Sequence, residues 1–192
     1  MDNPKKYLIA RILEFRKNKR RKLNVMPYRA ASNSDVVGTE SNSFKKGTEF
    51  EAFVVRRFDP ECFTLIEWRS DKSVEDIFPI MSKFPDLEFH FENCGEQIYF
   101  AIECKWRGTL PTTGITLDKF HLENYRHYEE VTGNKTFIVL GIGNTPNQPN
   151  KVYIIPLKDI KRDTINEFEL NVYQRKQPLD LFKFDFGKRI LS

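Results

Sequence analysis

Two segments that alternate apolar and polar residues, joined by a tight turn, constrain the fold of this chain more than any other feature. They span residues 86–92 (DLEFHFE) and 97–106 (QIYFAIECKW), and residues 93–96 (NCGE) lie between them. Strict alternation is typical of a β-strand with one buried face, and a short link that contains glycine is typical of a hairpin. The sequence therefore predicts an antiparallel hairpin centred between Cys94 and Gly95.

The register of this hairpin follows from its turn, because a slip of one residue would move every apolar side chain to the solvent face. One face then carries three apolar pairs: Leu87 with Ile102, Phe89 with Phe100, and Phe91 with Ile98. On the other face Asp86 lies directly across from Glu103, and Lys105 follows two residues later on the same side. Cross-strand partners have Cβ atoms about 4.5–5.5 Å apart, so these two carboxylates can share one divalent cation. Glu88 shares this face, as a charge expected to line the cleft.

Two carboxylates and a lysine on one polar face suit the hydrolysis of a phosphodiester. The negative phosphate repels hydroxide, and a cation at the scissile group removes that repulsion. Mg²⁺ takes oxygen ligands and retains waters, while a lysine ammonium stabilises the attacking water and the charge that develops on phosphorus. We therefore expect Asp86 and Glu103 to bind Mg²⁺, with Mn²⁺ as a substitute, and Lys105 to orient or activate water.

The same residues carry a resemblance to a known family. Pro85-Asp86, followed seventeen positions later by Glu103-Cys104-Lys105, resembles the signature of the PD-(D/E)XK, or restriction-endonuclease-like, nucleases. Residues 47–51 (GTEFE) resemble the start of that family's first helix. The resemblance spans roughly residues 44–160. It implies an α/β fold with a mixed central sheet flanked by helices, in the order α-β-β-β-α-β-β, and Mg²⁺-dependent endonuclease cleavage of DNA, less often of RNA.

The resemblance also implies a further acidic residue on the first helix, for which Glu49 and Glu51 compete. At about 100° per residue, Glu51 lies inside the apolar arc that contains Phe50 and Val54, whereas Glu49 lies on the opposite side. A carboxylate at the edge of the core needs a partner, which a metal or the catalytic lysine would supply. We expect Glu51 to join the site, with the backbone carbonyl of Cys104 as an additional metal ligand.

Around the hairpin, the pattern predicts two helices and three further strands. The helices span 44–58 and 118–132, the second ended by Gly133, and the strands span 62–68, 136–142 and 152–155. A long loop covers 70–84, a Ser- and Asn-rich linker covers 30–43, and alternating phenylalanines at 182–186 suggest one appended strand. We divide the chain into a basic N-terminal arm (1–40), a nuclease core (41–165) and a C-terminal extension (166–192).

Positive charge is concentrated in the arm. Residues 1–40 contain ten Lys or Arg and four Asp or Glu, which leaves residues 41–192 with a net charge of −2. The six residues at its peak can contact phosphates or belong to a solvated helix end: Arg16, Lys17, Lys19, Arg20, Arg21 and Lys22. The preceding segment, 7–15, predicts a short amphipathic helix that docks on the core, on a partner or on a membrane surface.

Four further residues are candidates for phosphate contact. Arg69 and Lys72 follow a predicted strand close to the expected cleft. His121 and Tyr125 lie on the second helix, on a face that also carries Phe120 and is expected to point inward. The alternative is that this face is core, with its polar tips satisfied by hydrogen bonds.

Composition excludes several classes of protein. No apolar run reaches the roughly 18 residues of a transmembrane helix, and the N-terminus lacks the apolar stretch of a secretory signal. The three cysteines show no CxxC spacing, which argues against a disulfide framework or a zinc site. We expect a cytoplasmic protein.

Two other functions stay open: a non-catalytic nucleic-acid-binding or assembly subunit on the same fold, and a membrane-peripheral or scaffold protein recruited by the arm. The complete set of Asp86, Glu103 and Lys105 favours the enzyme, with DNA as its partner and RNA not excluded. A homodimer or a complex with a partner protein is compatible with the sequence.

Overall fold

The computed structural model describes residues 39–69 and 84–192. The basic cluster and the amphipathic helix predicted for the arm, Lys72, and nearly all of the predicted loop at 70–84 lie outside these residues. Within them, no helix is long and apolar enough to span a bilayer.

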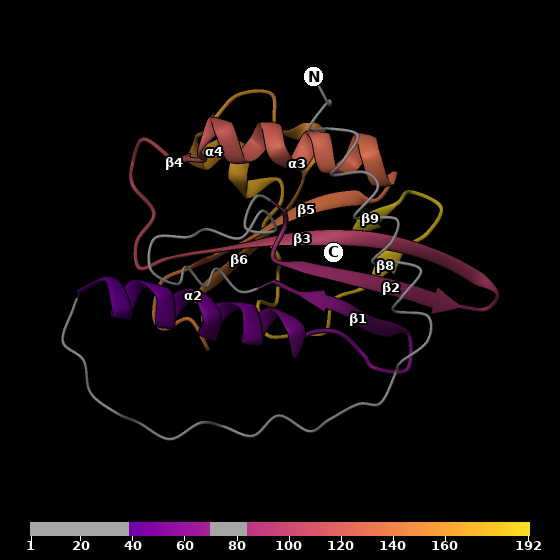
Figure 1. Ribbon diagram of the computed structural model, residues 1–192. Coiled ribbons are helices and arrows are strands. Elements are labelled where there is room, and N and C mark those ends of the chain that lie inside the picture. The colour runs from indigo at the N-terminus through magenta and orange to yellow at the C-terminus, as the bar shows by residue number, and fades with distance from the viewer. Residues whose placement is uncertain (1–38, 70–83) are drawn as a thin grey trace. The chain divides into compact units, whose positions relative to one another are not determined.

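A five-stranded mixed sheet forms the centre of the fold (Figure 1). In spatial order its strands are β1 (Phe63–Trp68), β2 (Leu87–Asn93), β3 (Glu96–Arg107), β5 (Lys135–Ile142) and β6 (Lys151–Pro156). Neighbouring strands are antiparallel except β3 and β5, which run parallel. The fold is therefore mixed α/β with a mostly antiparallel sheet.

Two helices lie on opposite faces of this sheet, α2 (Thr39–Val55) below it and α3 (Lys119–Thr132) above it in the view of Figure 1. Phe50, Phe53 and Val54 of α2 are buried in one hydrophobic cluster with the alternate residues of β2 and β3. Leu122 and Tyr125 of α3 are buried in a second cluster, against the other face of β5 and β6. Each face of the sheet thus has its own core.

Close packing of α2 depends on a glycine in β5. A Cβ atom at Gly141 would overlap the ring of Phe50, so a side chain there would force the helix away from the sheet. The absence of a side chain at this position lets the aromatic ring lie directly on the backbone of β5.

The predicted hairpin register is confirmed. Leu87 pairs with Ile102 and Phe89 with Phe100, and the ladder continues to Asn93 and Glu96. Cys94 and Gly95 both have positive φ, 51° and 83°, as the tightest hairpin turns require. The ladder stops at Leu87, so Asp86 lies one residue before β2 and not within it.

Helix α3 begins and ends where its capping residues indicate. The Asp118 side chain accepts a hydrogen bond from the backbone N–H of His121 (3.0 Å), and Gly133 ends the helix in the left-handed conformation with φ 73°. The predicted inward face is partly wrong, because Phe120 is 55% exposed and His121 is exposed. The buried face of α3 is centred on a different row of residues, which lie about one helical turn apart: Leu122, Tyr125 and Tyr128.

Two predictions at the edges of the fold are wrong. Helix α2 begins at Thr39, inside the predicted linker. Local helix propensity has a small effect compared with packing, so the apolar turns that follow can stabilise the helix even though it begins with Ser-rich residues. The C-terminal segment is not one appended strand, since β8 (Phe184–Asp185) pairs with β9 (Ile190–Leu191) in a small antiparallel hairpin. The remaining short elements are β4 (Ile115–Thr116), η2 (Leu157–Asp159), β7 (Thr164–Ile165) and α4 (Glu167–Asn171).

Candidate active site

The motif residues meet at the end of the hairpin that is distant from its turn. Phe100, Ile102 and Cys104 of β3 belong to the hydrophobic cluster between the sheet and α2. Side chains alternate along a strand, so Glu103 and Lys105 lie on the opposite face, towards α3. Asp86 and Glu103 are both buried, with 8% and 3% of their surface exposed.

The Asp86 carboxylate continues the ladder beyond the end of β2. Its Oδ2 accepts a hydrogen bond from the backbone N–H of Cys104, at 2.7 Å. The N–H and C=O of one strand residue point to the same neighbouring strand, so the Cys104 carbonyl is directed to the Asp86 side as well. The thiol of Cys104 packs in the core, where burial raises its pKa well above the ordinary value.

Negative charge is concentrated at this point. Burial, followed by the neighbouring charge of Glu103, raises the pKa of Asp86 well above its usual range; Lys105 opposes this shift and Glu51 adds to it. Lys105 forms an ion pair with Glu103, and the lysine side chain remains partly exposed. Several carboxylates held in a poorly solvated place are an arrangement that an added cation would stabilise.

Glu51 reaches the site from α2. Its Oε2 accepts a hydrogen bond from the indole Nε1 of Trp68, at 2.5 Å, and its charge contributes to the raised pKa of Asp86. The sequence predicted a metal or a lysine as the partner of Glu51 and did not single out Trp68. No sequence signal singled out this tryptophan, because its place depends on the pairing of β1 with β2, in which Trp68 lies opposite Leu87, beside Asp86.

A cavity of about 270 Å³ opens beside Glu103 and Lys105 towards α3. It is lined by residues of β3, β5, α3 and the segment before α3: Glu103, Lys105, Arg107, Leu117, Asp118, His121, Leu122, Tyr125 and Ile138. His121 and Tyr125 therefore lie next to the motif residues, as phosphate contact would require. Arg107 was not predicted from the sequence, although it stands two residues after Lys105 on the same side of the strand.

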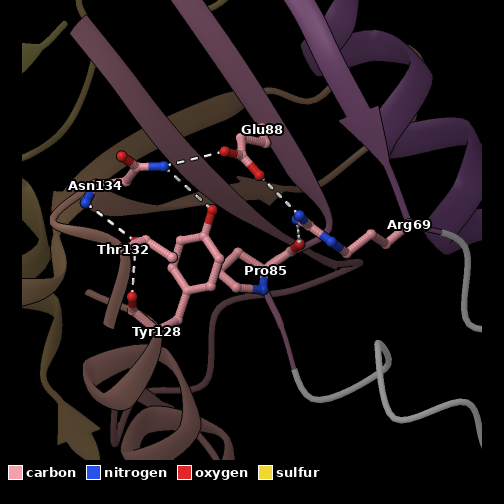
Figure 2. A network of polar contacts seen from close by, with 6 residues as sticks. All are labelled: Arg69, Pro85, Glu88, Tyr128, Thr132 and Asn134. Atoms are coloured by element: carbon pink, nitrogen blue, oxygen red, sulfur yellow. Dashed lines mark hydrogen bonds and ion pairs between the residues drawn. The ribbon is translucent and has the colours of Figure 1, made fainter. Parts of the chain in front are cut away.

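Arg69 lies in the protein interior, contrary to its assignment as a phosphate contact. Its Nη2 forms an ion pair with Glu88 Oε2 at 2.8 Å, and its Nη1 donates to the Pro85 carbonyl at 2.9 Å (Figure 2). The two side chains are only 10% and 9% exposed. Because its guanidinium is engaged there, we no longer assign Arg69 to phosphate, and Glu88 is a buried partner and not a charge lining a cleft.

The oxygen donors of the site fit a hard divalent cation better than a transition metal. Within residues 39–69 and 84–192, no group of three or more His, Cys, Asp or Glu side chains has an arrangement that would hold a metal ion. Mg²⁺ is commonly bound by only one or two carboxylates together with waters and substrate phosphates. Asp86, Glu103 and the Cys104 carbonyl supply that kind of donor set.

Comparison with known proteins finds likeness among solved structures and none among family models or curated proteins. Among solved structures, the chain is similar to Hjc of Archaeoglobus fulgidus, a Holliday junction resolvase from an archaeal hyperthermophile, with 20% identity and a TM-score of 0.46. The match covers 66% of this chain and 88% of that one. A TM-score of this size does not identify a family, so the function has to be inferred from the residues themselves.

Proposed function

We propose that this chain is a metal-dependent endonuclease of the PD-(D/E)XK kind, which hydrolyses phosphodiester bonds in DNA. The observation that carries the proposal is the buried pair of Asp86 and Glu103 at the end of a hairpin, with Lys105 ion-paired beside them at the mouth of a cavity. Buried carboxylates are costly without a compensating charge, and strongly perturbed pKa values such as that of Asp86 cluster at functional sites.

In this proposal Asp86 and Glu103 hold Mg²⁺, with Mn²⁺ as a substitute, and the Cys104 carbonyl and Glu51 complete the donor set. When bound, the cation supplies positive charge at the scissile phosphate and acidifies the water that it binds. The hydrogen bond from the Cys104 N–H fixes the orientation of the Asp86 carboxylate. The partly exposed ammonium of Lys105 is placed to orient water and to stabilise the charge that develops on phosphorus.

The cavity gives the substrate a place next to these groups. Arg107 and His121 bring donors to its lining, and the buried Tyr125 ring lines it from α3. Arginine and histidine are common contacts to phosphate oxygens. We propose that the phosphate next to the scissile bond binds there, with the six-residue basic cluster of the arm adding sequence-independent affinity for DNA.

A cleavage assay tests the proposal directly. Plasmid and single-stranded DNA should be cleaved with Mg²⁺ or Mn²⁺ and remain intact in EDTA, while Ca²⁺ should bind without supporting turnover. Lys105→Ala should abolish cleavage, whereas Lys151→Ala, which removes an exposed lysine of β6 paired with Glu167, should leave it unchanged. Undiminished cleavage in EDTA, or near-full activity of Lys105→Ala, would refute the site assignment.

Two matched pairs of variants test the acidic residues. Glu103→Ala should abolish cleavage, and Glu92→Ala, at the exposed end of the same hairpin, should not. Glu51→Ala should lower activity more than Glu49→Ala, because the charge of Glu51 acts on Asp86. DNA binding without cleavage under all conditions would instead support the non-catalytic subunit.

A further inference from the structure

A network of polar contacts links the end of β1 and the start of β2 to the last turn of α3 (Figure 2). It consists of six residues: Arg69, Pro85, Glu88, Tyr128, Thr132 and Asn134. Neither the proposed chemistry nor the cavity uses these groups. At one end of the network, Arg69 contacts the short segment that carries Asp86 into β2.

Arg69 binds this segment on both sides of Asp86. Its backbone N–H donates to the Asp86 carbonyl at 2.7 Å, and its Nη1 donates to the Pro85 carbonyl at 2.9 Å. Its Nη2 binds the Glu88 carboxylate at 2.8 Å. The planar guanidinium makes two of these contacts at once, which a lysine ammonium cannot reproduce with the same geometry.

The other end of the network is fixed to α3. Glu88 Oε1 accepts a hydrogen bond from Asn134 Nδ2 at 3.1 Å. The Asn134 N–H donates to Thr132 Oγ1 at 3.1 Å, and Thr132 Oγ1 donates to the Tyr128 carbonyl at 2.7 Å, in the last turn of the helix. Glu88 is therefore held from two sides and cannot follow a displacement of Arg69 without losing its contacts to the α3 end.

Aromatic rings fix the position of the guanidinium further. Its central carbon lies 5.9 Å from the centre of the Phe84 ring and 5.8 Å from that of Tyr128. Burial and the nearby charge of Glu88 raise the pKa of Tyr128 to about 12, so this phenol stays neutral at any physiological pH. The Tyr128 phenol therefore adds no second negative charge beside Arg69.

We propose that Arg69 is a positioning residue for the acidic site: it holds the backbone of Pro85 and Asp86 so that the Asp86 carboxylate stays on the Cys104 N–H beside Glu103. The inference rests on the proposed function. A buried ion pair is poor evidence of stabilisation, since an apolar pair of similar volume often serves as well. Arg69, however, contacts the backbone on both sides of Asp86, and an apolar residue could not make these contacts.

The experiment measures Mn²⁺ binding to the full chain, without DNA, from the electron paramagnetic resonance signal of free Mn²⁺. Arg69→Lys should weaken Mn²⁺ binding by about 10–100-fold, the usual effect of losing a residue that orients a metal ligand. At saturating Mn²⁺, the kcat for DNA cleavage should fall while the KM for DNA stays unchanged. Arg162→Lys, at an exposed ion pair with Glu169, should behave like the wild type.

Two further variants separate positioning from a loss of stability. Phe182→Leu shortens a buried side chain of the α2-side core, and it should lower the melting temperature without weakening Mn²⁺ binding. If Arg69→Lys does not fold, the double variant Arg69→Met/Glu88→Leu, which leaves no buried charge unpaired, takes its place and should fold without binding Mn²⁺ tightly.

The outcomes distinguish a failure of the proposed function from a failure of the positioning role. Wild-type protein whose Mn²⁺ binding is absent or survives Asp86→Asn would overturn the proposed function, and this inference with it. Asp86-dependent binding that stays within twofold of wild type in Arg69→Lys or the double variant would overturn the inference alone. Equal losses of Mn²⁺ binding in Phe182→Leu and Arg69→Lys would also overturn the inference, because a loss of stability would then explain both.

Discussion

The ion pair of Arg69 and Glu88 allows a stability prediction in which burial, and not distance, decides the outcome. Its nitrogen–oxygen distance of 2.8 Å is almost the same as the 2.7 Å between Arg162 and Glu169. The side chains of the first pair are 10% and 9% exposed, and those of the second are 61% and 40% exposed. Removal of Arg69 leaves a carboxylate in the interior, whereas removal of Arg162 leaves one in water.

The magnitude follows from that difference. Arg69→Met, which strands Glu88, should cost about 3–5 kcal/mol of unfolding free energy, as is typical when one partner of a buried pair is removed. For a chain of this size each kcal/mol lowers the melting temperature by about 2–4 °C, so the expected fall is about 6–20 °C. Arg162→Met should change it far less, because an exposed pair in high dielectric contributes little.

Thermal unfolding followed by circular dichroism, in EDTA, measures both changes. The double variant Arg69→Met/Glu88→Leu should recover most of the loss, since no unpaired charge remains in the interior. A double-mutant cycle then gives the coupling between the two residues. Similar small shifts for Arg69→Met and Arg162→Met, or purely additive losses in the double variant, would refute the reasoning.

Three other outcomes are expected from the structure and the sequence. In EDTA, Asp86→Asn should raise the melting temperature. The pKa of Asp86 is raised in the folded state, so the stability of the wild type is full below the ordinary pKa of an aspartate and is lost as the pH rises through the raised pKa. The stability gained by the variant should therefore grow with pH between these two pKa values. Gly141→Ala should cost about 1–3 kcal/mol by overlap with Phe50, in urea unfolding, while Gly47→Ala in α2, where nothing lies within 4 Å of the added methyl, should stabilise by up to about 1 kcal/mol. Deletion of residues 1–38 should weaken binding to duplex DNA and reduce the slope of log affinity against log salt by about 0.9 for each phosphate that the arm neutralises; an unchanged slope would show that the arm does not bind phosphates.

The hairpin could be predicted from the sequence because two independent signals agree there. Alternation with period two fixes which residues share a face, and the turn at Cys94 and Gly95 fixes which residues pair. The positions of Glu103 and Lys105 relative to the sheet follow at once. The ends of α3 could also be predicted from the sequence, since an aspartate cap and a glycine in the left-handed conformation are local features.

The pairing of Arg69 with Glu88 could not be predicted, because it depends on which strand lies beside β2. Strand β1 pairs with β2 through an irregular register, with a shift between Leu65 and Glu67, and this shift decides which residues lie opposite one another at the strand ends. Alternation alone places Glu88 on a polar face, which suggests exposure. The structure covers that face with Asn134 and the end of α3, so the same polarity marks a buried network.

Glu88 and Asp86 differ in how their charge is balanced, and this difference makes Asp86 a candidate for chemistry. Glu88 has a full countercharge in Arg69 and a hydrogen bond from Asn134, so nothing further is required to keep it buried. Asp86 shares its surroundings with Glu103 and Glu51, and the positive group that acts against this charge is Lys105, already paired with Glu103. The site therefore carries an excess of negative charge that would repel a phosphate. A divalent cation would remove this repulsion and supply the missing positive charge. The cluster of carboxylates is electrostatically unfavourable by itself, and for the same reason it would make the site selective for a cation.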